Sequence, residues 1–483
     1  MAKTITIGPF NRVEGDLKIK VEIKGNKITD TQASGVMFRG FEKILKGRDP
    51  MDAIVFTCRI CGICGIAHSI ASSNALASVF DSKMPPNAYL IRNISLGIET
   101  LISHITHFYV FFAVDLTNKK YSKATNYKEI LERFNQFNGT SFTKAVKARK
   151  NFVEILGFFV GKLPNTLVFQ PGGVTKTINT NEIIRIKSIL FNFKNFIEKN
   201  LLGSSIECWL NNKDISNLQK WLGKKEHENE DLGIFIKSCL DFGLDKLGKG
   251  PCKFLCFGNY NLPDGTTLVK SGYYDGTIKP FDQSKIKEHI KYSWFSGYEE
   301  GKNPLEGITE PLYDKPLAYS WAKAPRYDNE VVEVGPLARM IINKDPLISE
   351  LFNKFGSCVY TRTLARLHEI VKLVREIDTW IEKINPGEPF YIKPNKKPDG
   401  EGIGLIEAPR GSLGHWVVIE KNRIKNYQVI TPTAWNMSCR DSKDVPGVVE
   451  KALIGTFIGD EKNPVEIAHI IRSFDPCLVC TVH

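Results

Sequence analysis

The sequence has no internal repeat, no low-complexity linker and no apolar run near the length of about 18 residues that a membrane-spanning helix needs. Its start, MAKTITIGPF, lacks the charged and apolar regions of a signal peptide and leads directly into an alternating pattern. We therefore expect no membrane span of its own. We expect a cytoplasmic location, or membrane association through a partner, with export together with that partner left open.

An arginine-rich tract is also missing, although the chain is basic. Its 65 Lys and Arg residues exceed its 53 Asp and Glu residues, which gives a net charge of +12. The excess is mostly scattered lysine, and runs such as 144–150 lie in polar, helix-like stretches that are typical of solvated helix faces. We expect no nucleic-acid partner.

Eleven cysteines without a signal peptide argue against a disulfide framework and favour thiolate chemistry. Seven of them form no metal-binding pattern and fit buried small apolar residues: Cys58, Cys208, Cys239, Cys252, Cys256, Cys358 and Cys439. They offer no iron–sulfur pattern, and the sequence has no glycine-rich loop for the phosphates of a flavin or nicotinamide cofactor.

Local patterns predict a mainly α-helical (α+β) fold with a peripheral N-terminal β-sheet at about 1–35. LKIKVEI alternates apolar and charged residues, and Gly25-Asn26 predicts a turn back into KIT. Apolar residues recur at helical spacing in 87–115, 181–202 and 358–384, and shorter helices are expected near 446–458 and 464–473. Region 243–315 indicates irregular structure with short strands, and 415–431 predicts a hairpin. With no linker visible, we expect a single domain over 1–483.

Two clusters of metal-binding residue types lie near the two ends of the chain. RICGICGIAH contains Arg59, Cys61, Cys64 and His68, and DPCLVCTVH contains Asp475, Cys477, Cys480 and His483. A Cys-x-x-Cys unit places two thiolates on one side of a tight turn, close enough to share a metal. Two such pairs, each followed closely by a histidine, predict a metal site that includes a C-terminal segment at about 470–483.

A closed four-cysteine zinc site is the alternative at this point. Such sites usually join pairs about 15–20 residues apart in small units, whereas these pairs stand at 61–64 and 477–480 of a long chain. A ligand beside a chain end implies that the end is tied down, with His483 as a further ligand. It also suggests that the terminus is trimmed there. Spacing alone leaves zinc open.

At these residues the sequence closely resembles the large, catalytic subunit of nickel–iron hydrogenases. That family carries R-x-C-G-x-C-x-x-x-H near its start and D-P-C-x-x-C-x-x-H at its end, and both are complete here. Segments in the family's order extend the resemblance along the chain: NRVEGDLKI, FRGFEKILKGRDP, THFY, PGGV, AYSWAKAPRYDNEVVEVGPLARM, EAPRGSLGHW and NYQVITPTAWN. The resemblance implies a multihelical large-subunit fold and reversible heterolytic cleavage of H₂, in the uptake direction.

The resemblance also implies the roles of the cysteines. Cys61 and Cys477 would be terminal nickel ligands, while Cys64 and Cys480 would bridge nickel to an iron that carries carbonyl and cyanide. Soft thiolates suit both metals. In family terms the proton acceptor is either the Cys477 thiolate or the guanidinium of Arg410.

Further roles follow position by position from the family motifs. Glu14 would relay protons, and Glu42, His483 and the backbone carbonyl of Val429 would hold Mg²⁺. Without the motifs, Glu14 and Glu42 would be surface carboxylates and Arg410 a surface ion pair. The remaining family positions would support the centre: Pro409 beside Arg410, Pro432 and Thr433 at an iron-bound cyanide, Asp475 near the metals, and Arg59 and His68 as hydrogen-bond donors to the thiolates.

Two positions depart from the family pattern. Ser103 stands where many respiratory members have Asp, so one carboxylate above the metals is missing, and SHITHFYVFF looks more like the uptake and sensory branch. Cys58, directly before Arg59, is expected to be inert packing, with a redox-active role as the alternative.

Electrons from H₂ need a route out that this chain does not supply. By resemblance, the partner is a small subunit with iron–sulfur clusters, in a heterodimer or a higher oligomer of heterodimers. Two other functions compete with the enzyme. A hydrogen sensor would use the same site at low turnover, and the quinone-site subunit of respiratory complex I shares the fold but lacks the cysteines.

Overall fold

The N-terminal sheet has the predicted alternation. In this computed structural model, which describes residues 3–395, 397 and 399–483, strands β1 (Lys3–Ile7), β2 (Leu17–Lys24) and β3 (Lys27–Gly35) form an antiparallel sheet in the order β1-β2-β3. Alternate residues of β2 from Leu17 to Ile23 are buried, because side chains on a strand point to opposite faces. The prediction for this region is confirmed.

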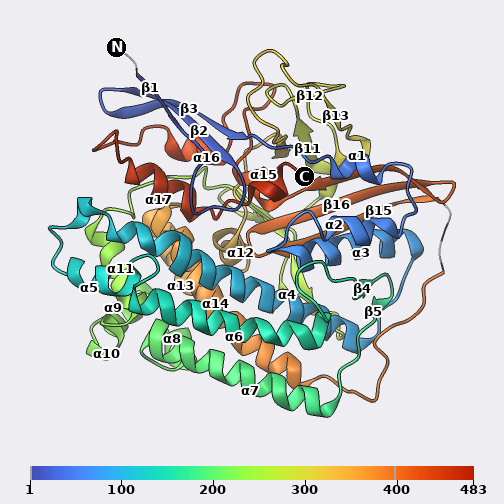
Figure 1. Cartoon of the computed structure of the whole chain (residues 1–483), viewed down its shortest axis with the longest axis horizontal. Helices are drawn as coiled ribbons and strands as arrows, with labels where there is room; N and C mark the ends of the chain where they lie inside the picture. Colours follow the sequence, from blue (N-terminus) through green and yellow to red (C-terminus); the bar gives the residue numbers. More distant parts are fainter. Residues whose placement is uncertain (1–2, 396, 398) are drawn as a thin grey trace.

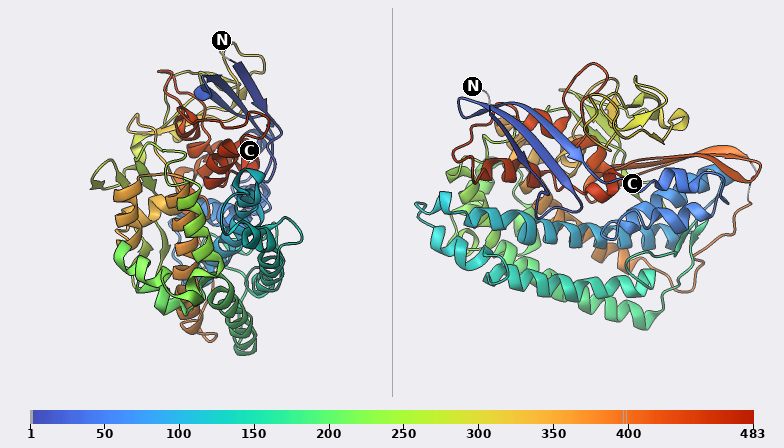
Figure 2. Two further views of the ribbon diagram at one scale, coloured as in Figure 1. Left: turned by 90° about the vertical axis from the view of Figure 1, so that its left-hand side faces the viewer. Right: turned by 45° about the horizontal axis from the view of Figure 1, so that its top comes forward.

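Five long helices form the body of the molecule. α3 (Gly65–Phe80), α4 (Pro86–Thr106), α6 (Thr140–Val160), α7 (Thr180–Phe196) and α14 (Val359–Glu382) are shown in Figures 1 and 2. α4 packs against both α14 and α6, and α6 packs against α7. The three predicted long helices are thus α4, α7 and α14.

Two of these helices end differently from the expectation. α4 continues as a π-helix, η1 (His107–Phe112), followed by a 3₁₀ turn, η2 (Ala113–Thr117), and α7 continues as a second π-helix, η4 (Ile197–Leu202). π-Helical turns are uncommon and occur frequently at functional sites. Here η1 carries the HFY segment toward the C-terminal part of the chain.

One segment is longer and more apolar than expected, so the prediction of no apolar run near membrane-spanning length is wrong there. The continuous helix Pro86–Thr117 is long and apolar enough to cross a bilayer. Most of it is buried within the protein, against α14 and α6, as the core helix of a globular fold would be. It is therefore weak evidence for a membrane span.

A second antiparallel sheet covers α3. Strands β15 (Gly400–Ala408), β16 (Gly411–Glu420) and β17 (Arg423–Ile430) are ordered β15-β16-β17, which confirms the predicted hairpin and adds β15. β15 was missed because its glycines weaken a strand pattern. They are needed: a Cβ on Gly404 would lie 1.9 Å from the carbonyl oxygen of Ala71, and one on Gly402 would lie 2.1 Å from that of Ala75. The sheet approaches α3 backbone to backbone.

The remaining elements are short. The helices are α1 (Phe41–Leu45), α2 (Asp52–Thr57), α5 (Tyr127–Phe134), α8 (Ile206–Leu210), α9 (Ile215–Leu222), α10 (Lys225–Glu228), α11 (Asp231–Asp241), α12 (Pro336–Ile342), α13 (Pro346–Phe355), α15 (Pro432–Asn436), α16 (Val448–Leu453), α17 (Val465–Ser473) and α18 (Leu478–Thr481). The strands are β4 (Phe169–Gln170), β5 (Gly173–Val174), β6 (Phe254–Cys256), β7 (Asn259–Asn261), β8 (Thr267–Val269), β9 (Gly272–Tyr274), β10 (Ile278–Lys279), β11 (Ile286–His289), β12 (Phe295–Ser296), β13 (Glu310–Pro311) and β14 (Ala324–Tyr327). Most of these strands lie in 243–315, as predicted.

Candidate metal centre

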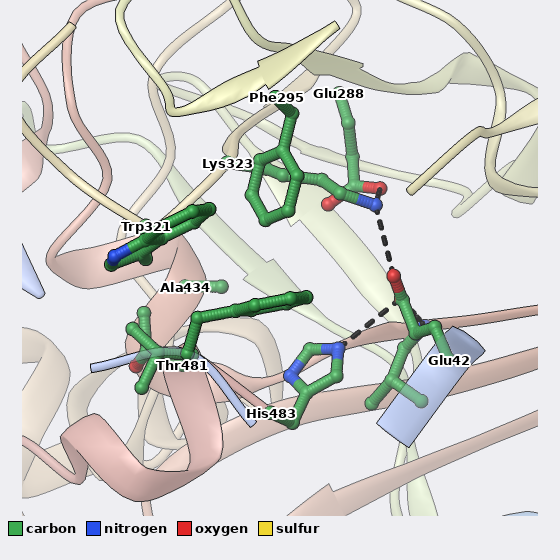
Figure 3. Close-up of a pocket in the computed structure, with 11 residues that line it drawn as sticks. Glu42, Glu288, Phe295, Trp321, Lys323, Ala434, Thr481 and His483 are labelled. Carbon is green, nitrogen blue, oxygen red and sulfur yellow. Dashed lines mark hydrogen bonds and ion pairs between the residues drawn. The ribbon is translucent and has the colours of Figure 1, made fainter. Parts of the chain in front are cut away.

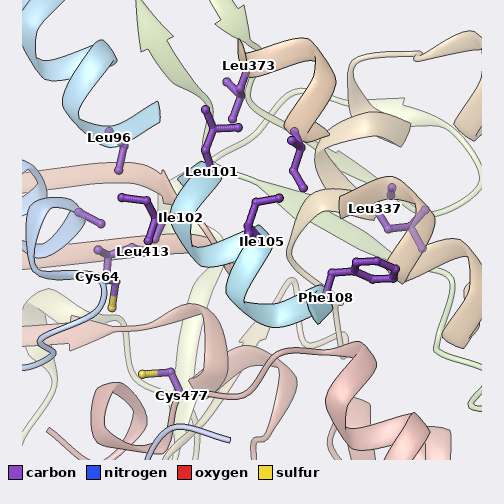
Figure 4. Packing of buried hydrophobic residues seen from close by; sticks show 14 of the residues in the cluster. Cys64, Leu96, Leu101, Ile102, Ile105, Phe108, Leu337, Leu373, Leu413 and Cys477 are labelled. Atoms are coloured by element: carbon purple, nitrogen blue, oxygen red, sulfur yellow. The ribbon is translucent and has the colours of Figure 1, made fainter. Parts of the chain in front are cut away.

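The two Cys-x-x-Cys units each lie at the start of a helix. Cys64 immediately precedes α3, and Cys477 immediately precedes α18, which contains Cys480. Figure 4 shows Cys64 and Cys477 below the apolar side chains of α4, among them Ile102 and Ile105. The cysteines thus lie inside the hydrophobic core.

The four sulfur atoms form one compact group. The Sγ–Sγ distances are 3.6 Å between Cys61 and Cys477, 3.2 Å between Cys64 and Cys480, and 3.0 Å between Cys477 and Cys480. All four lie within 4.8 Å of one another. Two thiolates on one metal at about 2.3 Å each can be up to about 4.6 Å apart, so this group fits thiolates that share metal ions.

Burial of this group requires a compensating positive charge. Each of the four cysteines is buried, and none forms a disulfide. Hydrogen bonds from neighbouring thiols hold the pKa of Cys61 well below its usual value, whereas burial raises the pKa of Cys480 well above it. Four thiolates would not ionise together in such a place without a cation. The donor set is soft and suits nickel and iron.

Glu14 is attached directly to the second cysteine pair. Its N–H donates to the carbonyl of Pro476 at 3.3 Å, and its own carbonyl accepts the N–H of Leu478 at 2.6 Å, so it forms a parallel bridge with Cys477. Gly15 has φ +80°, and a Cβ there would lie 2.8 Å from the nitrogen of Val479. Only glycine lets the two segments come this close.

The Glu14 side chain lies between the core and the surface. Its burial is intermediate, and partial burial together with the nearby Cys61 raises its pKa above the usual value. A carboxylate with a raised pKa beside a buried thiol group is suited to proton exchange.

Arg410 and Asp475 form a buried ion pair next to the cysteines. Arg410 donates from Nε to the backbone carbonyl of Asp475 at 2.9 Å and from Nη2 to its Oδ1 at 3.2 Å. Burial opposes the charge on Arg410, but Asp475 and the cysteine thiolates outweigh it and raise its pKa further. Arg410 therefore presents a permanent positive charge to the thiols.

A small cavity lies against the sulfur atoms. It is lined by Cys64, Cys477 and Cys480 and, on its other sides, by His68, Ala408, Pro409, Arg410, Leu413, Pro432 and Thr433. The hydroxyl of Thr433 also accepts the N–H of Cys477 at 3.0 Å. The structure thus brings Pro409, Pro432 and Thr433 to the cysteine group, mostly with apolar surface.

Glu42 and His483 meet in a second pocket, shown in Figure 3. Glu42 Oε1 lies 3.2 Å from His483 Nε2 and accepts the N–H of Val429 at 2.8 Å. Val429 lines the same pocket, so the three residues expected to hold Mg²⁺ come together. Burial works against ionisation of Glu42, but Lys323 and His483 outweigh it and lower its pKa to about 2. Glu42 is therefore a carboxylate at neutral pH.

Four residues of this pocket and its rim were not expected from the sequence. Lys323 Nζ lies 2.6 Å from Gln428 Oε1 and 3.3 Å from Glu42 Oε2, and Thr309 donates to Glu42. Glu288 Oε2 lies 3.6 Å from the same ammonium, and burial raises the pKa of Glu288 to about 6. Lys323 lies in a segment that carries the resemblance, but only its three-dimensional position reveals the contact.

Arg59 does not lie where it was expected. It is exposed, and its Nη1 donates to the carbonyl of Val55 and approaches Cys58 Sγ at 3.6 Å, instead of a clustered thiol. The reason is geometric: Arg59 lies at the end of α2, and its side chain folds back over that helix. Cys58 is buried, and burial raises its pKa, which fits inert packing.

Glu99 is a buried carboxylate that sequence reasoning missed. Its two oxygens accept the N–H groups of Ile66 at 2.8 Å and Ala67 at 3.0 Å, so it caps the first turn of α3 directly after Cys64. Among the described residues no cation forms an ion pair with it. Burial raises its pKa to about 8. No motif surrounds Glu99 in the long apolar helix α4, so the sequence does not indicate that it caps α3. Ser103, on the same helix, is buried, and its hydroxyl has no hydrogen-bond partner in the part of the chain described here.

Comparisons with known proteins agree with this geometry. A family model described as nickel-dependent hydrogenase matches residues 39–129 and 116–483. The large subunit of the periplasmic NiFeSe hydrogenase of Desulfomicrobium baculatum is 33% identical over 517 residues, which covers 99% of this chain and 94% of that protein. The uptake hydrogenase large subunit of Rhodobacter capsulatus is 30% identical over 583 residues, which covers 100% of this chain and 95% of that protein.

Solved structures extend the match to the fold. The Ni-Fe-Se hydrogenase of D. vulgaris Hildenborough superposes with a TM-score of 0.87 at 34% identity, with all of both chains covered. Selenium is named for those relatives, whereas the four clustered positions of this chain are all cysteine. The relatives are named as hydrogenases and uptake hydrogenases, which favours the enzyme over a hydrogen sensor. The chain therefore belongs to the nickel-dependent hydrogenase family and is a hydrogenase large subunit, the catalytic part of an oxidoreductase that acts on dihydrogen.

Proposed function

We propose that Cys61 and Cys477 are terminal ligands of nickel, and that Cys64 and Cys480 bridge nickel to an iron carrying carbonyl and cyanide. The observation that supports this is the group of four buried sulfur atoms within 4.8 Å, drawn from both ends of the chain. The cavity lined by Pro432, Thr433 and Leu413 would hold the small iron ligands. When bound, the centre supplies a metal that takes up the hydride equivalent of H₂.

The protein's part in heterolysis is to accept the proton and lead it away. Cys477 is the candidate acceptor, and Arg410, whose pKa is raised well above its usual value, lines the same cavity as a permanent cation. Glu14, bridged to Cys477 through the backbone, is the candidate for the next transfer because it is half-buried and has a raised pKa. Asp475 holds the Arg410 side chain in place.

We also propose that Glu42, His483 and the carbonyl of Val429 hold Mg²⁺. An ionised carboxylate and an imidazole lie 3.2 Å apart in this pocket. Lys323 offsets part of the negative charge of Glu42 and Glu288. Because the protein offers only three ligands, water molecules would complete the coordination of a hard ion. The site would fix the C-terminal residue close to Cys480.

Electrons must leave toward a partner subunit, and we propose that it binds beside the Cys61–Cys64 loop. The loop between Cys61 and Cys64 reaches the surface at Gly62, beside the exposed Arg59. Exposed apolar side chains lie on neighbouring segments: Val36 at 42%, Met37 at 39% and Leu163 at 38% exposure. The Val36–Met37 segment leads into Arg39, which donates to the carbonyl of Ile60 directly before Cys61. Leu163 is next to Pro164, which is 3.9 Å from the Cβ position of Gly62. Apolar surface at this point is suited to a permanent interface with an iron–sulfur small subunit.

A copurification experiment tests this surface. In the coexpressed complex, Met37→Asp together with Leu163→Asp should release the small subunit, while Phe191→Asp should not. Phe191 is a matched control because it is 62% exposed on α7, away from the cysteine loop. Retention of the partner by the double variant, at wild-type yield, would exclude this surface.

The metal assignment is tested by infrared spectroscopy and elemental analysis of the intact complex. We expect bands of metal-bound carbonyl and cyanide that shift under H₂, together with nickel, iron and magnesium. Cys64→Ser or Cys480→Ser should abolish assembly of the centre. Zinc without such bands would refute the assignment.

We further propose that residues 1–483 form one domain, because both ends contribute to one centre. One relative is named as periplasmic. We propose that any export or membrane association of this chain, which is otherwise expected in the cytoplasm, runs through its partner.

A further inference from the structure

Four buried side chains form a continuous hydrogen-bonded series behind the cysteine group. His68 Nδ1 lies 3.1 Å from His415 Nε2, and His415 Nδ1 lies 2.8 Å from the Tyr427 hydroxyl. That hydroxyl lies 3.1 Å from Ser72 Oγ. Each of the four residues is at most 1% exposed. Of the four, only His68 has a role that the family motifs imply.

The series connects α3 to the β16–β17 hairpin. Cys64, His68 and Ser72 follow each other at helical spacing and so lie on one face of α3. His415 is on β16 and Tyr427 on β17, both facing this helix. His415 pairs in the sheet with Val429, which donates its N–H to Glu42. The hairpin thus reaches His68 from β16 and the Glu42 pocket from β17.

The bonding pattern determines which nitrogen of His68 faces the cysteines. Nδ1 is used by His415, so Nε2 remains for the cavity that His68 shares with Cys64 and Cys480. Both rings are buried, and within the described residues their side-chain partners are each other and the Tyr427 hydroxyl, with no carboxylate among them, so we treat both as neutral imidazoles. A neutral imidazole has one N–H, and the partner of one nitrogen decides whether the other carries it.

Two orientations of the series are possible. In the first, Tyr427 donates to His415, His415 donates to His68, and His68 presents an N–H to the thiolates. In the second, Tyr427 donates to Ser72, as the angles at the two hydroxyls have it here, while His415 donates to Tyr427, His68 donates to His415, and His68 presents a lone pair. The two orientations differ only in which atoms carry the protons. Negative sulfur beside the cavity favours the first, because a lone pair facing a thiolate is repelled and an N–H is attracted.

We propose that His415 and Tyr427 are positioning residues that hold His68 in the tautomer whose Nε2–H donates to the bridging thiolates. The inference rests on the proposed roles of Cys64 and Cys480. A donor fixed in this way draws electron density from the sulfur and tunes the metals bound to it. The series ends at the fully buried Ser72, so within the described residues it has no visible outlet to solvent and is suited to orientation instead of proton transport.

Packing alone does not require this arrangement. A layer between a helix and a sheet is filled at least as well by apolar side chains, whereas each buried polar group costs free energy unless it finds a partner. Here three side chains besides His68 are polar, and all are satisfied by one another.

Replacement of His415 gives the first test, on the intact metal-loaded complex. His415→Leu should shift the carbonyl and cyanide bands to lower wavenumber, because a thiolate that loses its donor passes more electron density to iron. Activity per nickel should fall by about 10- to 100-fold, which is typical when such supporting contacts are lost. His415→Gln should restore both, since an amide N–H can donate to His68 Nδ1. Unshifted bands in a fully loaded His415→Leu variant would overturn the proposal.

Tyr427→Phe gives a second test that removes one oxygen atom. Its control is Tyr260→Phe, another buried tyrosine, whose hydroxyl lies 3.4 Å from Thr100 and outside the series. We expect a band shift in Tyr427→Phe only. This variant decides the matter if His415→Leu does not fold or load metal: identical bands in both phenylalanine variants would overturn the proposal. If wild-type protein shows no such bands, the proposed diatomic ligands fail instead, which is a different result.

Discussion

Asp115 connects the two segments that meet at the centre, and its removal should separate them. At the end of the extended α4 helix, its carboxylate pairs with Arg12 on one oxygen and with Arg472 on the other. Arg12 lies in the segment that leads into Glu14, and Arg472 lies in the segment that leads into Cys477. Arg472 also donates to the carbonyl of Asn11 at 2.8 Å. We expect Asp115→Asn to loosen the Glu14 segment from the Cys477 segment while leaving the four cysteines in place.

The structure sets the size of the effect. The side chains of Asp115 and Arg472 are 6% and 2% exposed, and that of Arg12 is 17% exposed. Removing one partner of a buried ion pair costs about 3–5 kcal/mol. Asparagine keeps one acceptor and Arg12 reaches solvent, so we expect the low end, about 3 kcal/mol. At 1.4 kcal/mol per factor of ten, this is about a hundredfold rise in local opening.

Amide hydrogen exchange followed by mass spectrometry measures this opening. Peptides that contain Glu14 and Leu478, whose backbones bond to each other, should exchange about a hundredfold faster in Asp115→Asn. Activity per nickel should fall by about 10- to 100-fold, because misplacement of a transfer group by about 1 Å has effects of that order.

Asp441→Asn is the matched control. Asp441 forms a 2.8 Å ion pair with Arg326, with side chains 5% and 1% exposed, but it does not contact the Glu14 or Cys477 segments. It should lose comparable stability yet keep its activity per nickel. Unchanged hydrogen exchange and activity in Asp115→Asn would refute the role given to Asp115. Equal activity losses in both variants would mean that Asp115 only stabilises the protein as a whole.

Three further predictions concern single carboxylates. Glu14→Gln should keep its metals but slow H₂ oxidation by about 100-fold, and loss of nickel in this variant would contradict the role of Glu14. Because Glu14 acts in its ionised form and its pKa is raised, wild-type activity should fall as the pH drops toward that pKa. The variant should not show this fall. Glu42→Gln should lower the magnesium content of the purified protein, and unchanged magnesium would disprove the site. Glu99 has a pKa of about 8 against an ordinary 4.5, so its contribution to stability is full below 4.5 and lost as the pH rises through 8. Denaturation of Glu99→Gln at pH 6 and pH 9 should show a relative gain at pH 9, and parallel curves would argue against the shift.

The long helices and the N-terminal sheet were predictable because their signals are local. Apolar spacing of 3.6 or 2 residues identified α4, α7, α14 and β2 without tertiary information. β15 escaped because Gly402 and Gly404 are required by the closeness of α3, and a glycine needed for a contact looks in the sequence like a weak strand. The buried helix Pro86–Thr117 shows the same limit, since apolar composition does not distinguish a protein core from a bilayer.

Some residues of the candidate site were likewise predictable from the sequence, and others were revealed only by the tertiary structure. In the sequence, residue type and short spacing predicted the four cysteines and His483 as ligands, whereas the roles of Glu14, Glu42 and Arg410 were implied only by the family resemblance. Only the tertiary structure decided that Arg59 turns away from the thiols, that Lys323 enters the Glu42 pocket, and that His415 and Tyr427 lie behind His68. These contacts join residues far apart in the chain, and their partners are set by how helices and sheets pack, which no local pattern encodes.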